Sequence, residues 1–135
     1  MKRHTGVAAR YYGGRTKGAA KGTKPKDATD RMNKTEQRFA DHLELQRIAG
    51  VITWWAFEPM TWRIAENTSY KPDFMTQDAD GHLHVYEIKP ASRGTFARTD
   101  VAWLKLKVVK EQFPFPLDVA WQTKDGIWHF EALHR

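Results

Sequence analysis

The chain has 135 residues, of which 41% are hydrophobic and 28% charged, and it contains no cysteine. This length suits one domain, and the hydrophobic content excludes a wholly disordered chain. The lack of cysteine excludes disulfide scaffolds, thiolate zinc sites and cysteine nucleophiles. Because no run of about 18 apolar residues occurs, we expect no membrane association and a soluble protein of the cytoplasm.

The positive charge lies at one end of the chain. Of the 22 basic residues, eight precede the first acidic residue, Asp27, so residues 1–26 carry +8 and the rest carries 14 basic against 16 acidic residues. Five of the nine glycines are in the same segment. We therefore expect residues 1–28 to be a disordered basic arm that binds nucleic-acid phosphates, or else a solubilising leader. The candidate phosphate contacts in this arm are Lys2, Arg3, Arg10, Arg15 and Lys17.

Residues 29–135 are expected to form one α/β domain. Asn33-Lys34-Thr35-Glu36 is a capping-box pattern that predicts the start of a helix, and Gly50 predicts its end. Patterns of β-branched, aromatic and turn-forming residues then predict, in chain order, strands at 51–57, 61–65, 71–76 and 82–89, a helix at 100–112, and strands at 117–122 and 127–133. The expected architecture is a mixed β-sheet of about five strands flanked by helices.

Apolar residues at helical spacing predict which face of each helix is buried. In the first helix these residues are Phe39, Ala40, Leu43, Ile48 and Ala49. In the second helix they are Val101, Leu104, Val108 and Val109.

Two carboxylates and a lysine are expected to meet where two strands end. Alternation along 82–89 places Glu87 and Lys89 on one face, and the Asp80-Gly81 turn brings the strand containing Asp73 alongside. Two carboxylates are what Mg²⁺ needs from a protein that leaves room for water and phosphate oxygens, and a nearby lysine can help the attacking water. The alternative is that Asp73 is a turn residue and that Glu87 and Lys89 form an exposed ion pair.

The histidines of the same strand are predicted to lie on the opposite face. His82 and His84 alternate with Glu87, so we interpret them as surface or packing residues rather than metal ligands.

Pro72-Asp73 followed by Glu87-Ile88-Lys89 resembles the signature of the PD-(D/E)xK nuclease superfamily. A wider set of segments resembles phage endonuclease I type Holliday-junction resolvases: 33–36, 57–59, 67–74 and 87–89. The resemblance covers about residues 33–116 and implies a restriction-endonuclease-like fold.

The resemblance also implies roles for individual residues. Asp73, Glu87, the backbone carbonyl of Ile88 and Glu36 would bind Mg²⁺, with Mn²⁺ as a substitute, and Lys89 would serve the nucleophilic water. Glu36 could instead be only the capping-box partner of Asn33. Further candidate DNA contacts are Arg93, Arg98, Lys105 and Lys107, although a solvated helix face explains the two lysines equally well.

The function that these features imply is a metal-dependent endodeoxyribonuclease, a hydrolase of DNA recombination that cuts branched DNA such as Holliday junctions. Cutting both strands symmetrically requires two sites, so a homodimer is expected, in the host-cell cytoplasm if the gene belongs to a phage. The alternative is a noncatalytic nucleic-acid-binding module that retains the nuclease fold. A sequence-specific restriction enzyme is less favoured, because so short a chain leaves little room for an element that contacts base edges.

Overall fold

The computed structural model describes residues 31–133, and the predicted arm and domain boundary at residue 28 lie outside this range. Within residues 34–133 the helices are α3 (Lys34–Ile48) and α4 (Asp100–Gln112). The main sheet contains β1 (Ile52–Phe57), β4 (Phe74–Asp78), β5 (Leu83–Ile88), β8 (Leu117–Gln122) and β9 (Trp128–Ala132). Two small ribbons pair β2 (Trp62–Ala65) with β3 (Thr68–Tyr70) and β6 (Ala91–Ser92) with β7 (Thr95–Phe96).

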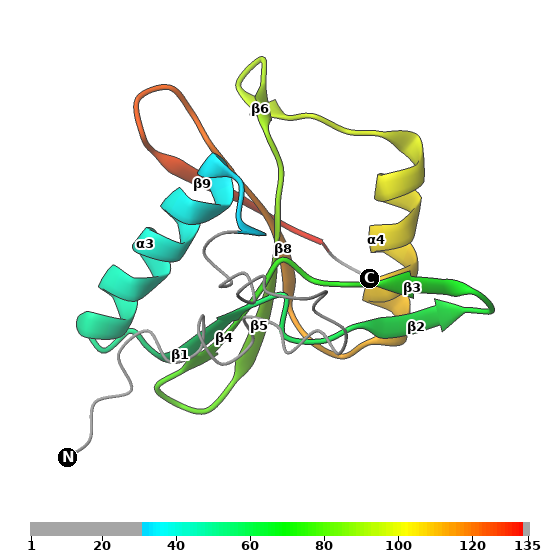
Figure 1. Cartoon of the computed structure of the whole chain (residues 1–135), viewed down its shortest axis with the longest axis horizontal. Coiled ribbons are helices and arrows are strands. Elements are labelled where there is room, and N and C mark those ends of the chain that lie inside the picture. Colours follow the sequence, from blue (N-terminus) through cyan, green and yellow to red (C-terminus); the bar gives the residue numbers. More distant parts are fainter. Residues whose placement is uncertain (1–30, 134–135) are drawn as a thin grey trace, which may run out of the picture.

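The main sheet is mixed, and β5 is its central strand. The strand order is β1-β4-β5-β8-β9, in which β5 and β8 are parallel and the other neighbours are antiparallel. Figure 1 shows α3 and α4 on opposite sides of this sheet. The predicted α/β class, with a five-stranded mixed sheet flanked by helices, is confirmed.

Alternating side chains of the central strands form two separate cores. On the α3 side, the fully buried ring of Phe39 lies 5.1 Å from Phe74, 5.3 Å from Tyr86 and 4.9 Å from Trp128, measured between ring centres. On the α4 side, Val85 packs in a cluster that includes Leu106, Met75 and Val109. The sheet is therefore covered on both faces.

Part of the predicted helix burial is wrong. Ile48 is 69% exposed, and Val101 and Leu104 of α4 are 81% and 63% exposed. An α-helix turns by about 100° per residue, so Ile48 lies roughly opposite the buried Phe39. Helix α4 carries two apolar stripes on opposite sides, and the stripe that contains Leu106 and Val109 is the one that packs on the sheet.

Two chain segments differ from the predicted strands. The predicted strand at 61–65 is present as β2, but it pairs with β3 in a separate ribbon, and residues 66–67 turn between them. The predicted loop after Pro90 contains the short ribbon of β6 and β7. Trp62 of β2 stacks on Phe113 with 4.4 Å between ring centres, and this contact fixes the first ribbon beside the end of α4.

Replacing Phe39 with Ala should lower the free energy of unfolding by about 3–5 kcal/mol, because this ring fills the space between α3 and three strands. Chemical denaturation of the purified variant measures the change. Leu104→Ala is the matched control, and since Leu104 is 63% exposed it should change stability by no more than about 0.5 kcal/mol. Equal losses in the two variants would show that the core is wrongly assigned.

Candidate active site

Asp73 and Glu87 lie side by side because β4 and β5 are antiparallel. Phe74 is paired with Tyr86 in the ladder, so the preceding residue, Asp73, stands opposite Glu87. The site is thus built where β4 begins and β5 ends, in the middle of the sheet rather than on its outer strands.

The carboxylate of Asp73 forms a hydrogen bond to β5 just beyond the last paired residues of β4 and β5. Its Oδ2 accepts a hydrogen bond of 2.7 Å from the backbone N–H of Ile88. Burial raises the pKa of Asp73 well above its usual range, and the charge of Glu87 raises this pKa further, while the bond from Ile88 opposes the shift. Asp73 is therefore a partly buried carboxyl group whose negative charge is poorly compensated.

The carboxylate of Glu87 is held on both oxygens. Its Oε1 accepts from Lys89 Nζ at 2.9 Å and its Oε2 accepts from the Tyr70 hydroxyl at 2.7 Å. The side chains of Glu87 and Lys89 are only 12% and 21% exposed, so their contact is not the exposed ion pair considered as the alternative. Glu87 and Lys89 do share one face of the strand, as the alternation predicted.

Glu36 reaches this centre from the first turn of α3. The capping box is present: Asn33 N donates to Glu36 Oε2 at 2.8 Å, and Glu36 N donates to Asn33 Oδ1 at 2.9 Å. Burial raises the pKa of Glu36, and the charges of Glu58 and Glu87 raise it further against the effect of the Asn33 N–H. Glu36 is therefore both the capping-box partner of Asn33 and a member of the acidic group.

We call Glu36, Glu58, Asp73 and Glu87, whose charges act on one another, the acidic centre. Among these, Glu58 had no predicted role. Its backbone N–H donates to Asp73 O at 2.8 Å, and its carboxylate lies 3.1 Å from Arg31 and 3.5 Å from Lys71. The sequence offered one signal for Glu58: this acidic residue stands between the end of a predicted strand, Phe57, and Pro59.

Tyr70 is the second residue that sequence reasoning missed. It is only 5% exposed and contacts Glu87 through its hydroxyl. Burial raises the pKa of this hydroxyl well above its usual range, and the charge of Glu87 adds to the shift, so Tyr70 remains a proton donor to Glu87. Its position three residues before Asp73 gives no sign of this contact, which depends on how β3 folds back.

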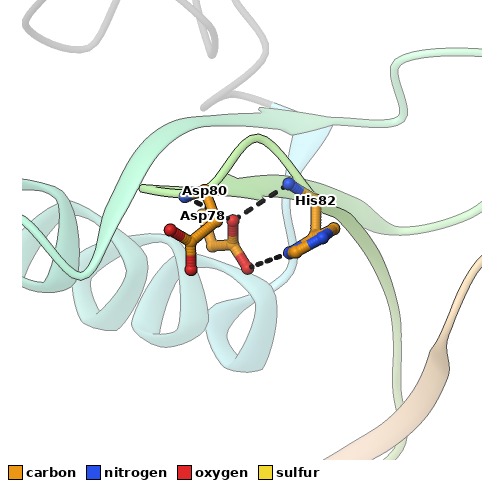
Figure 2. A group of neighbouring side chains, drawn as sticks. All are labelled: Asp78, Asp80 and His82. Carbon is orange, nitrogen blue, oxygen red and sulfur yellow. Dashed lines mark hydrogen bonds and ion pairs between the residues drawn. The ribbon is translucent and has the colours of Figure 1, made fainter.

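A different group has the compactness expected of metal ligands. Among residues 31–133, Asp78, Asp80 and His82 are the set of three such side chains whose ligand atoms all lie within 4.8 Å of one another (Figure 2). Asp78 Oδ1 accepts the backbone N–H groups of Asp80 and His82, each at 2.9 Å. These bonds close the turn between β4 and β5, and this structural role explains the cluster.

The second histidine packs within the fold. His84 stacks on Tyr86 with 4.5 Å between ring centres. Its Nε2 lies 3.2 Å from Asp118 Oδ2, but the angles do not meet those of a hydrogen bond. Of the two roles that the sequence allowed, surface or packing, His84 thus has a packing contact.

The predicted DNA-contacting residues are scattered. Arg98 lies 3.0 Å from Glu131 and 4.4 Å from the ring centre of Trp103. Arg93 is exposed in the turn between β6 and β7, while on α4 Lys105 is half-buried and Lys107 is exposed. The arm residues Lys2, Arg3, Arg10, Arg15 and Lys17 lie outside the described part of the chain.

Comparison with protein-family models, with curated proteins and with solved structures finds no match to this chain. In residues 31–133, no helix combines the length and the apolar character needed to cross a membrane.

Replacing Asp73 with Asn should make the protein more stable at neutral pH. The folded protein binds a proton that the unfolded chain releases above its ordinary pKa, about 4, so wild-type stability should fall as the pH rises from there through the raised pKa of Asp73. Asn keeps an acceptor for the Ile88 N–H but cannot ionise, which should reduce this fall. Urea unfolding from pH about 5 to about 8 measures it.

Asp78 provides a control of opposite sign. Its pKa is lowered, chiefly by the bond from His82 N, so its contribution is present above the unfolded pKa and is lost as the pH falls. Asp78→Asn should therefore lose a little stability at neutral pH. Identical pH profiles for wild type and Asp73→Asn would contradict the assigned environment of Asp73.

Proposed function

We propose that this protein is a metal-dependent endodeoxyribonuclease of the PD-(D/E)xK type that hydrolyses phosphodiester bonds, with branched DNA as its substrate. The observation that carries the proposal is the meeting of Asp73, Glu87 and Lys89 at the junction of β4 and β5, with Lys89 Nζ 2.9 Å from Glu87. The order of the elements that position them, a helix, three main-sheet strands, a second helix and a parallel strand, supports it as well.

The chemistry of the donor set fits a divalent cation. Asp73 is partly buried and lies beside another carboxylate, whose charge contributes to the raised pKa of Asp73, and a bound cation would neutralise this negative charge. Asp73, Glu87 and the Ile88 carbonyl would hold Mg²⁺ or Mn²⁺, with Glu36 nearby, and a bound cation supplies Lewis acidity toward a phosphoryl oxygen.

The residues of the chain itself have distinct tasks in this proposal. Lys89 orients the attacking water and offers positive charge to the phosphorus centre. The hydroxyl of Tyr70 fixes one carboxylate oxygen of Glu87, while Lys89 contacts the other oxygen. A homodimer would present two such sites to the two strands of a junction.

Wild-type protein with Mg²⁺ should cut a synthetic four-way junction, and EDTA should abolish cutting. Asp73→Asn should lower the cleavage rate by about 100-fold or more, because metal stabilisation of the transition state is worth several kcal/mol. Lys89→Met should cost about 100-fold or more if its charge stabilises the transition state. Gel analysis of junction and linear duplex DNA measures both rates.

Arg47→Ala is the control for these variants, since Arg47 forms an ion pair with Glu44 near the other end of α3. It should cut as wild type does. The enzyme proposal fails if wild type cuts neither DNA, or if Asp73→Asn cuts as fast as wild type.

A second candidate function is a noncatalytic DNA-binding module. The observation in its favour is that both carboxylate oxygens of Glu87 already accept hydrogen bonds from protein groups, at 2.9 and 2.7 Å. Such a module would bind DNA in a salt-sensitive way without any metal, and deletion of residues 1–26 would abolish tight binding.

Tyr70→Phe separates the two candidates further. Without the hydroxyl, Glu87 keeps its hydrogen bond from Lys89 and loses the one from Tyr70. This loss should lower metal affinity or activity by about 10- to 100-fold. Titration of Mg²⁺ in the cleavage assay should show a higher half-saturating concentration. An unchanged Mg²⁺ titration would show that Tyr70 does not contribute to the site. If the protein is a DNA-binding module, neither wild type nor Tyr70→Phe would cut DNA at any Mg²⁺ concentration.

A further inference from the structure

Glu58 adopts a costly backbone conformation beside the acidic centre. Its φ is +44°, in a region that non-glycine residues occupy at a cost of about 1–3 kcal/mol. Among the described residues, the other two non-glycine residues with positive φ, Asn67 and Arg93, lie in the turns of the two small ribbons. Glu58 lies between β1 and β2, which do not pair with each other, so no hairpin turn accounts for its conformation.

The backbone bond of Glu58 fixes this residue relative to Asp73. Its N–H donates to Asp73 O at 2.8 Å, one step beyond the last ladder pair, Phe57 with Phe74. The strained residue is therefore joined directly to the backbone of Asp73.

The carboxylate of Glu58 gathers cations from two separate segments. Glu58 Oε2 lies 3.1 Å from Arg31 Nη1, which precedes α3, and 3.5 Å from Lys71 Nζ, which precedes β4. The guanidinium of Arg31 also lies 5.9 Å from the ring centre of Phe57. Both cations are thereby held at the same carboxylate oxygen, Glu58 Oε2.

These ion pairs do not explain the strain as a matter of stability. The side chains of Glu58, Arg31 and Lys71 are 26%, 32% and 48% exposed. Ion pairs so accessible to water contribute at most about 1 kcal/mol each, which does little more than offset the backbone cost. The arrangement is better explained by what the two cations can bind.

The two cations border a region that repels DNA. Glu58 acts electrostatically on Glu36, and Lys71 is two residues before Asp73, so both cations lie at the rim of the acidic centre. A phosphate that approaches the carboxylates needs positive charge nearby. An arginine presents a planar fork of donors to phosphate oxygens, and a lysine adds a compact charge.

We propose that Arg31 and Lys71 bind the phosphates of the DNA backbone beside the acidic centre, and that Glu58 is a positioning residue that holds both cations there before DNA arrives. The inference rests on the proposed function in one respect, that DNA is the substrate. On binding, the phosphates take the place of Glu58 Oε2 beside both cations.

Equilibrium DNA binding in EDTA tests the phosphate contacts without requiring cleavage. Arg31→Ala and Lys71→Ala should each weaken binding several-fold, and each should lower the slope of log affinity against log salt by about 1. Arg47→Ala removes an arginine from a comparable ion pair with Glu44 and should leave affinity and slope unchanged. Wild-type affinity and slope in both rim variants would overturn the inference.

Glu58→Gln tests the positioning role, because it removes the charge and keeps the size of the side chain. DNA no longer competes with a carboxylate, so KM should fall several-fold, while single-turnover cleavage should slow by roughly 10-fold because the cations are no longer held in place. A purely structural role would worsen KM and rate together, and that result would overturn the positioning role.

Glu58→Gly separates the carboxylate from the backbone, since glycine adopts positive φ without strain. It should reproduce the KM and rate changes of Glu58→Gln while unfolding at an equal or higher denaturant concentration than Glu58→Gln. Wild-type behaviour of Glu58→Gly would contradict the inference. If no protein cuts DNA but the rim variants still lose affinity and slope, the nuclease proposal fails and the phosphate contacts stand.

Discussion

Mutual repulsion of carboxylates is the constraint around which this end of the molecule is arranged. Asp73 and Glu87 are brought together by the antiparallel pairing of β4 with β5, and burial and the charge of Glu87 raise the pKa of Asp73 against the effect of the Ile88 N–H. Each carboxylate has its own partner: an amide for Asp73, a hydroxyl and an ammonium for Glu87, a helix cap for Glu36, and two exposed cations for Glu58. The partners reduce the repulsion without cancelling it, and the pKa values of Asp73 and Glu36 remain raised.

The rest of the fold keeps these groups in register. The two cores on either side of the sheet hold α3 and α4 against the central strands, so the first turn of α3 delivers Glu36 to the place where β5 ends. Because Phe39 contacts rings from three strands, a shift of α3 would disturb the sheet and the acidic centre together. Packing and electrostatics are thus coupled through one helix.

The sequence was informative wherever the deciding interaction is local. A capping box and an Asp-Gly turn act over a few residues, so the start of α3 and the meeting of Asp73 with Glu87 could be predicted. The buried face of α4 could not, because two apolar stripes compete on that helix and tertiary packing selects one. Tyr70 and Glu58 were missed for the same kind of reason: one acts through a ribbon that folds back on the site, and the other through a backbone angle that composition does not reveal.

The ribbon of β2 and β3 begins just after Glu58 and ends at Tyr70. Its Trp62 stacks on Phe113, and its Ile64 carbonyl accepts a 3.0 Å hydrogen bond from Gln112, so it is fastened to the far end of α4. The ribbon therefore connects two contacts of the acidic centre: Glu58, which pairs with Arg31 and Lys71, precedes it, and Tyr70, which donates to Glu87, ends it. A molecule that pulled the ribbon away from α4 would disturb both at once, without touching a single carboxylate.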